Sequence, residues 1–397
     1  MSFTRHVRKL VSLSALSASV LLGACGGGGG SSGTTSADTG ALKVSLTDAP
    51  ACGFEKVNVS VSKVRVHKSS SAGDAASGWQ DINLEPPRKI DLLTLRNGIM
   101  TELGQTTLPA GHYTQMRLVL AENASGALAN SVVAEGSNAE IALETPSAIQ
   151  SGIKLNNAFD IAANATTELV LDFDACKSIV TKGNGGYQLK PVIGVTPKVV
   201  SGGITGYVTP GLSKVVVSAQ QNGVVVKSTV PDATGAFTLS PMPASATSYV
   251  VVVTADGRAT AAVTGVPVTV GTTTQLSTSA APIAPPASAM GTVSGTVSPA
   301  TAQATVRALQ VIGTGGPTVE VGYQAANVTT GAYSLSLPVG AVSLGSYGAL
   351  PITFSTTSTL VTAGKYAIEA SATGYTKQSV DVDIAGTNAT RNFTLTQ

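Results

Sequence analysis

The chain has 397 residues and a formal net charge of +2, and it is 43% hydrophobic, 4% aromatic and 12% charged. A charge so close to neutral excludes the basic surface of a typical nucleic-acid-binding protein. The length allows several domains of about 100 to 200 residues each. Because Val and Thr favour strands and Gly favours turns, we expect an all-β protein.

The N-terminal segment has the organisation of a secretory signal. Basic residues precede an apolar run from Leu10 to Leu22, and Gly23 and Ala24 follow it directly before Cys25. The run is shorter than the roughly 20 residues that a membrane-spanning helix needs, so it predicts a cleaved signal peptide at 1–24. An ordinary signal peptide, with Cys25 incidental, is the alternative.

The sequence Leu22-Gly23-Ala24-Cys25 resembles the lipobox of bacterial lipoproteins. The resemblance implies acylation of Cys25, with palmitate among the attached chains, and several buried acyl chains give a stable anchor. A glycine rather than an aspartate follows Cys25, which in this class implies an outer-membrane location. Residues 25–40, rich in Gly and Ser, are expected to form a flexible tether.

Two further cysteines, Cys52 and Cys176, bracket one region of the chain. In an exported protein they are expected to form a disulfide, which would stabilise the fold by about 4 to 5 kcal/mol in the chain-entropy model. Two buried thiols and a metal pair are the alternatives. His67 and His112 are the only histidines after the signal, so a zinc site has little support.

A first β-rich domain is expected over residues 41–200. Alternation over 57–66 is the strongest strand signal, and its change of phase at Ser62-Lys63 predicts a β-bulge. Asn97-Gly98 predicts a turn, and residues 91–95 could form one short helix. The other expected strands are 42–46, 79–84, 90–95, 113–120, 140–143, 159–161, 167–173 and 187–195.

Short motifs in this region resemble a family of bacterial lipoprotein domains of unknown function. The motifs are LTDAP at 46–50, IDLL at 90–93, LPAGHY at 108–113, RLVL at 117–120, LDFD at 171–174 and LKPVI at 189–193. They are specific in combination, although no single motif is. The resemblance implies an envelope lipoprotein without a known activity.

The remainder of the chain contains a divergent internal repeat. TGAFTL at 234–239 corresponds to TGAYSL at 330–335, and YVVVVTADG at 249–257 corresponds to YAIEASATG at 366–374. The growing spacing predicts insertions in the second copy, the larger one between Pro338 and Gly364. We expect a β-sandwich at 201–279, a semi-rigid Pro/Ala linker at 280–290 and a second β-sandwich at 291–397.

The two copies resemble carboxypeptidase regulatory-like domains, which share a transthyretin-like or carbohydrate-binding-like sandwich. The first copy has Asp232 three residues before its hairpin glycine, as this family usually does, whereas Val328 occupies that place in the second copy. The expected fold class is therefore all-β, with three successive antiparallel β-sandwich domains after a signal peptide and tether.

The best candidates for chemistry are carboxylates. Asp172 and Asp174 lie two residues apart in an expected strand and would share a face, and Asp48 could join them if the first and late strands pair. Three carboxylates could bind Ca²⁺, and a solvated strand face is the alternative. For Asp381 and Asp383 we expect the solvated face.

Aromatic side chains are the other candidates, because aromatic rings present flat surfaces to ligands. Trp79, Tyr323 and Tyr347 could bind a ligand, with Trp79 as a stacking surface for a sugar, although a lone tryptophan in a strand is usually a core residue. His67 and His112 could be ligands, a pH-sensitive pair or merely hydrogen-bonded side chains. Hydrolase, zinc-protease and phosphate-loop motifs are missing from the sequence, so we expect no enzymatic activity.

These features predict a non-catalytic, lipid-anchored protein of the outer membrane that binds, adheres or acts as a scaffold. Its partners would be the membrane, through the lipid on Cys25, and a glycan or an envelope protein. One alternative is a carbohydrate-binding protein that uses the C-terminal sandwiches. Another is a Ca²⁺-dependent receptor or enzyme that uses Asp48, Asp172 and Asp174, and no other cofactor is expected.

Overall fold

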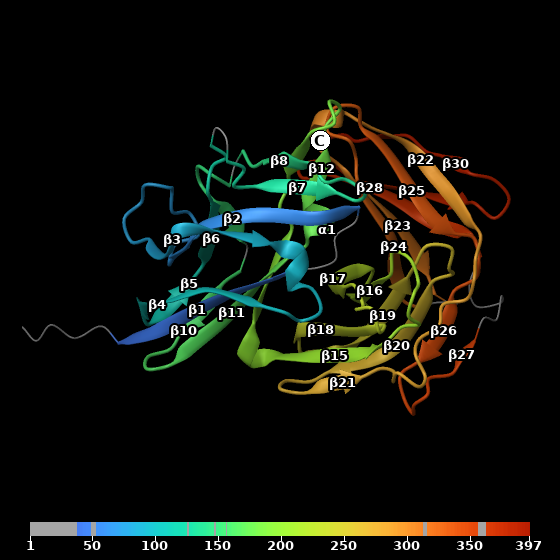
Figure 1. The fold of residues 1–397 in the computed structure, drawn as a ribbon, viewed down its shortest axis with the longest axis horizontal. Coiled ribbons are helices and arrows are strands. Elements are labelled where there is room, and N and C mark those ends of the chain that lie inside the picture. The colour runs from blue at the N-terminus through green and yellow to red at the C-terminus, as the bar shows by residue number, and fades with distance from the viewer. Residues whose placement is uncertain are drawn as a thin grey trace, which may run out of the picture. The chain divides into compact units, whose positions relative to one another are not determined.

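A computed structural model of the chain describes residues 38–48, 53–124, 127–146, 148–155, 157–312, 316–355 and 363–397. The predicted signal peptide, most of the tether, Cys25 and Cys52 lie outside these residues. Strands make up nearly all regular structure in the described ranges (Figure 1), so the all-β class is confirmed. None of the helices described there is long and apolar enough to cross a bilayer.

The first domain is built on two main sheets. The smaller sheet has the order β14-β11-β1-β4, and β1 pairs with β11 in parallel, so the domain is not purely antiparallel. The strands of this sheet are β1 (Thr39–Asp48), β4 (Thr101–Pro109), β11 (Thr166–Phe173) and β14 (Ile193–Pro197). Leu42, Val44 and Leu46 alternate along β1 into the core, as its sequence predicts.

The larger sheet has eight strands in the order β12-β13-β8-β7-β2-β6-β9, and β3 also pairs with β2. These strands are β2 (Phe54–His67), β3 (Gln80–Asp91), β6 (Gln115–Leu120), β7 (Ser131–Ala134), β8 (Glu140–Glu144), β9 (Ile153–Leu155), β12 (Ile179–Thr181) and β13 (Tyr187–Leu189). Strands β5 (Gly111–Tyr113) and β10 (Phe159–Ile161) form a separate antiparallel pair. Helix α1 (Ala175–Ser178) follows β11.

The bulge and the short helix predicted in this domain are present, whereas the predicted break at Pro86-Pro87 is not. The bulge in β2 is present, because its register with β3 and β6 shifts between Val61 and Lys63. Residues Leu92–Leu95 form a short 3-10 helix capped by Asp91. Pro86-Pro87, expected to separate two strands, lies within the continuous strand β3, opposite the bulge and without a partner residue in β2, where proline is tolerated.

The two repeats share one strand order, which agrees with the predicted internal repeat. The first repeat has the sheets β18-β15-β21 and β17-β16-β19-β20, and the second has β25-β22-β30 and β24-β23-β28-β29. The first uses β15 (Ser201–Tyr207), β16 (Val216–Gln221), β17 (Val224–Thr229), β18 (Ala236–Pro243), β19 (Ser245–Thr254), β20 (Ala261–Val268) and β21 (Thr273–Gln275). The second uses β22 (Met290–Ser298), β23 (Thr305–Val311), β24 (Thr318–Ala325), β25 (Ala332–Pro338), β28 (Lys365–Ser371), β29 (Gln378–Asp383), β30 (Ala389–Thr390) and β31 (Phe393–Thr394).

Equivalent residues close the hairpins of both repeats. Gly235 and Gly331 have φ angles of 84° and 70°, and an added Cβ would lie 2.0 Å and 2.2 Å from the carbonyl oxygens of Val208 and Val297. Only glycine fits such a position without strain. The shared Thr-Gly-Ala-aromatic motif therefore reflects a backbone requirement.

The predicted larger insertion in the second repeat joins the sheet of the first. Its strands β26 (Ser343–Ser346) and β27 (Phe354–Ser355) extend that sheet to β17-β16-β19-β20-β26-β27, and β26 lies beside β20 in parallel (Figure 1). The segment expected to be a linker also packs against the first repeat, since Ile283 is buried and bridges Val208. The repeats are thus interlocked within one compact unit, residues 38–397.

Candidate functional site: a charged junction of three domains

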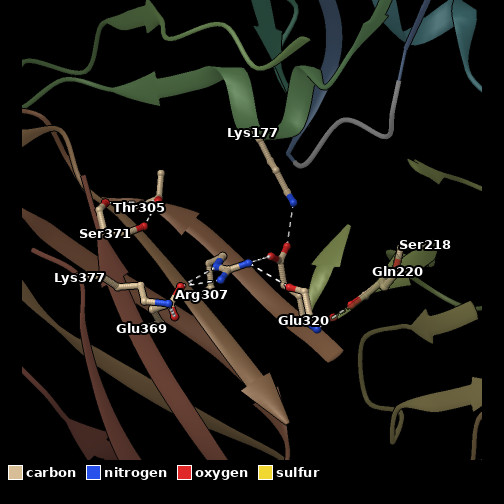
Figure 2. Close-up of polar contacts among 10 residues, drawn as sticks. Lys177, Ser218, Gln220, Thr305, Arg307, Glu320, Glu369, Ser371 and Lys377 are labelled. Carbon is tan, nitrogen blue, oxygen red and sulfur yellow. Dashed lines mark hydrogen bonds and ion pairs between the residues drawn. The ribbon is translucent and has the colours of Figure 1, made fainter. Parts of the chain in front are cut away.

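Buried charges converge where the first domain meets both repeats. Lys177 on α1 places its Nζ 2.8 Å from Glu320 Oε1 on β24, and Arg307 on β23 places Nη1 3.2 Å from Glu320 Oε2 (Figure 2). Only 6% of the Glu320 side chain is exposed. A buried carboxylate is tolerated because two cations compensate its charge.

The chain of charges continues across the second repeat. Arg307 and Glu369 are cross-strand neighbours on β23 and β28, and Glu369 also lies 2.8 Å from Lys377 (Figure 2). Burial alone would raise the pKa of Glu369, but hydrogen bonds from Lys377 and Arg307 outweigh it and hold that pKa below its usual value. The charges therefore alternate in sign from Lys177 to Lys377.

The first repeat contributes neutral contacts to the same junction. The Gln220 side chain donates to the Glu320 carbonyl oxygen at 2.8 Å and accepts from the Glu320 N–H at 2.7 Å, so its amide pairs with the backbone of β24 (Figure 2). Ser218 orients this amide through a bond of 2.9 Å. Arg307 also donates to the Gly223 carbonyl oxygen at 3.0 Å.

A cavity of about 190 Å³ lies at this junction and is lined by all three domains. Asp174 of the first domain, Ser228 of the first repeat and Tyr323 of the second repeat are among its lining residues. Burial raises the pKa of Asp174 to about 6, against the opposing effect of Lys177. Lys177 Nζ lies 4.9 Å from the ring centre of Tyr323, a cation–π distance.

The three predicted carboxylates do not share one face. The strands β1 and β11 do pair, with Thr47 opposite Asp172 and Asp48 opposite Phe173, but neighbouring residues of a strand face opposite ways. Asp48 is therefore buried in the core, where desolvation raises its pKa well above the usual value, while Asp172 faces the first repeat. Asp174 lies beyond β11 and caps α1.

The Ca²⁺ prediction for these three aspartates is consequently wrong. No group of three metal-ligating side chains occurs anywhere in the part of the chain that the structure describes. Asp48 Oδ1 accepts from the Ala175 N–H, and Asp174 Oδ1 accepts from the Lys177 N–H. Asp172 instead meets Lys227 of β17, with Nζ 2.7 Å from Oδ2.

The predicted ligand-binding aromatic residues occupy three separate places. Trp79 is partly buried beside Arg65 and Arg117, whose Cζ atoms lie 4.8 Å and 4.7 Å from its ring, and its Nε1 donates to the Gly73 carbonyl oxygen. It therefore covers two guanidinium groups rather than filling the core. Tyr323 lines the junction cavity, and Tyr347 packs against the core of the first repeat.

The histidines do not form a pair. His67 is hydrogen-bonded to Ser69 and Ser77, whereas His112 Nδ1 lies 2.7 Å from Asp160 Oδ1 on the exposed face of the β5–β10 pair. The hydrogen-bonded alternative therefore holds for both. Asp381 and Asp383 are exposed on β29, as expected for a solvated face.

Cys176 lies on α1 and lines the junction cavity. This cysteine is disulfide-bonded. Because Cys52 lies outside the described residues, its pairing with Cys176 stays a prediction.

No motif in the sequence identifies the residues that build the junction. A signal was present, since Arg307 and Glu369 are rare charges between apolar neighbours in strands of a chain with few charged residues. Val328 does not take the place of Asp232 in the second repeat. Asn327 takes the place of Asp232, because both accept backbone N–H bonds in the hairpin and the second loop is one residue longer.

Residues 39–191 match the family described as Domain of unknown function (DUF4382). A search of curated proteins finds no match to the chain.

Solved structures that resemble the chain include a Streptococcal ancillary pilin, with 8% identity, coverage of 90% of this chain and 99% of the pilin, and a TM-score of 0.16. BcpA, the major pilin subunit of Bacillus cereus, has 11% identity, coverage of 90% and 99%, and a TM-score of 0.15. A leucine-rich repeat protein from Bacteroides thetaiotaomicron has 13% identity, coverage of 64% and 27%, and a TM-score of 0.16. Scores of this size define neither a shared fold nor a shared function.

Proposed function

We propose that the chain is a non-catalytic protein of the cell envelope whose three β domains act as one rigid body that holds a partner near the membrane. The observation that carries this proposal is the interlocking of the domains. The ion pair of Lys177 with Glu320 joins the first domain to the second repeat, the Gln220 amide joins the first repeat to the same strand, and the insertion of the second repeat extends a sheet of the first. A rigid body fixes the position of a bound partner, whereas domains on free linkers would not.

Membrane attachment would come from the lipid on Cys25, and the tether at 25–40 would give the body its reach. Metabolic labelling with a palmitate analogue and membrane fractionation test this part. The intact protein is expected in the outer-membrane fraction with label, and Cys25→Ser is expected unlabelled and released. Label on Cys25→Ser would contradict the anchor.

A partner would find a recessed surface between the first domain and the first repeat. Two adjoining hollows there, of about 570 Å³ and 710 Å³, share Phe54, Glu55, Arg96 and Asp232. Crosslinking of the anchored protein in envelope preparations, followed by mass spectrometry, would identify what binds.

Arg96→Glu replaces the basic side chain that the two hollows share with an acidic one and is expected to reduce recovery of the partner at least tenfold. Lys154→Glu, an exposed charge reversal on β9, is the matched control and should leave recovery unchanged. Equal recovery with both variants would place the partner elsewhere, and no recovery even from the unaltered protein would count against a binding role.

A further inference from the structure

A second charged contact between domains differs from the junction described above. Lys227 on β17 of the first repeat faces Asp172 on β11 of the first domain, with Nζ 2.7 Å from Oδ2. The side chains are only 3% and 16% exposed. The amine and the carboxyl group are therefore held together almost entirely away from water.

The contact has the distance of an ion pair but not the direction of a hydrogen bond. Lys227 Nζ and Asp172 Oδ1 are both buried without a hydrogen-bond partner in the described part of the chain. A charged hydrogen bond needs the donor near a lone-pair direction of the oxygen as well as a short distance. The nitrogen thus lies beside the carboxyl group in an arrangement that a stable salt bridge does not favour.

The neighbours of Asp172 in its sheet do not supply the missing partner. Thr47, on one side, directs its hydroxyl to the carbonyl oxygens of Leu95 and Ile99. Gly194, on the other side, has no side chain. Two polar atoms buried without hydrogen-bond partners lower the stability of the fold. Glu320 differs, because each of its carboxylate oxygens contacts a cation.

From this geometry we propose that Lys227 and Asp172 condense to form an intramolecular amide bond that joins the first domain covalently to the first repeat. Transfer of one proton from the ammonium group to the carboxylate gives a neutral amine and a neutral acid. The Nζ lone pair then attacks Cγ, the bond from Cγ to one carboxyl oxygen breaks, and that oxygen leaves as water with the second proton of Nζ. No oxidant, reductant or other reactant is required.

Two features of the site favour this reaction. Fixed, close placement of the reacting groups gives effective concentrations on the order of 10⁵ M or more in well-oriented intramolecular reactions. The product carries no charge, so the bond removes the cost of two ions buried without full compensation. Hydrolysis of the amide would need a water molecule at this site. Because the site is almost closed to solvent, this reverse reaction is disfavoured once the expelled water has left.

The test is the mass of the full chain carrying Cys25→Ser, which avoids lipid heterogeneity, measured after reduction of disulfides. We expect the measured mass of most molecules to be one water molecule below the mass calculated from the sequence. Peptide mapping should show a branched peptide in which Lys227 and Asp172 are linked, with no tryptic cleavage after Lys227. The proposal would be overturned if the measured mass equalled the mass calculated from the sequence and if Lys227 and Asp172 were both found in linear peptides.

Two variants locate the bond. Lys227→Arg keeps the positive charge but is expected to restore the mass calculated from the sequence. Lys177→Arg, the same change at another lysine of a domain boundary, should keep the loss of water. Loss of water that persists in Lys227→Arg would also overturn the proposal. If Lys227→Arg fails to fold, the peptide map of the parent chain decides the question alone.

Discussion

Strands β17 and β24 occupy equivalent positions in the two repeats, and both carry a charged residue to the first domain. Lys227 on β17 meets one carboxylate and leaves polar atoms unpaired, whereas Glu320 on β24 meets two cations and a side-chain amide. The duplication thus conserves the place of contact but not its chemistry. The fold of each repeat comes from its shared glycines and apolar residues, and the joints come from residues that the copies do not share.

The largest effect should come from the shared hairpin glycines. Gly331→Ala would force a Cβ against the Val297 carbonyl oxygen at a positive φ angle, and backbone strain plus overpacking should lower the free energy of unfolding by about 5 kcal/mol. Gly235→Ala should cost a similar amount, because its Cβ would meet Val208 in the same way. Chemical denaturation measures both losses.

Gly386→Ala is the control for these variants, since no atom lies within 4 Å of its added Cβ. We expect it to change stability by less than about 0.5 kcal/mol. If only one of Gly235 and Gly331 tolerated alanine, the hairpins of the two repeats would not be equivalent.

The next largest effect concerns the joint itself. Glu320→Gln keeps the backbone bonds to Gln220 but leaves Lys177 and Arg307 without their shared carboxylate, which should cost about 4 kcal/mol. Asp383→Asn, in an exposed pair at 3.9 Å from Lys365, should cost less than about 1 kcal/mol. If calorimetry showed that both variants lose the same small amount of stability, the junction would not hold the domains together.

The pH dependence of the joint should be somewhat weaker. The pKa of Asp174 is about 6 in the folded chain and 3.8 in its ordinary state, so the folded chain binds this proton more tightly. Its stabilising contribution is complete below pH of about 4 and is lost as the pH rises through about 6, a change of about 3 kcal/mol.

Asp174→Asn removes this contribution, so its stability should fall less than that of the parent chain between pH of about 4 and 7. Thermal unfolding over this range gives the comparison. Parallel profiles for the two proteins would mean that Asp174 titrates normally.

The smallest effect should come from two equivalent tyrosine hydroxyls. Tyr249 donates to the Pro243 carbonyl oxygen and Tyr366 to that of Pro338. Replacing either with Phe removes one hydrogen bond and should cost about 1 kcal/mol. Denaturant titration of both variants sharpens the comparison, since a clearly larger loss at one site would mean that the repeats use this bond differently.

Local patterns predicted the fold class, the bulge in β2, the short helix after Asp91 and the existence of the internal repeat, because each depends on neighbouring residues. The site was less predictable. Whether Asp48 and Asp172 share a face depends on the register of β1 with β11, and the partners Lys227 and Glu320 lie far away in the chain. The sequence also could not show that the insertion after Pro338 belongs to the sheet of the first repeat.

The parallel pairing of β26 with β20 has a consequence for the order in which the chain can fold. As synthesis proceeds from the N-terminus, β20 emerges well before residues 343–346 that cover it. During that interval the first repeat has an open edge, and an uncovered edge strand can pair with strands of other molecules. The first repeat therefore becomes protected only after strands β22 to β25 of the second have been made, so truncation after residue 340 would leave a product prone to self-association.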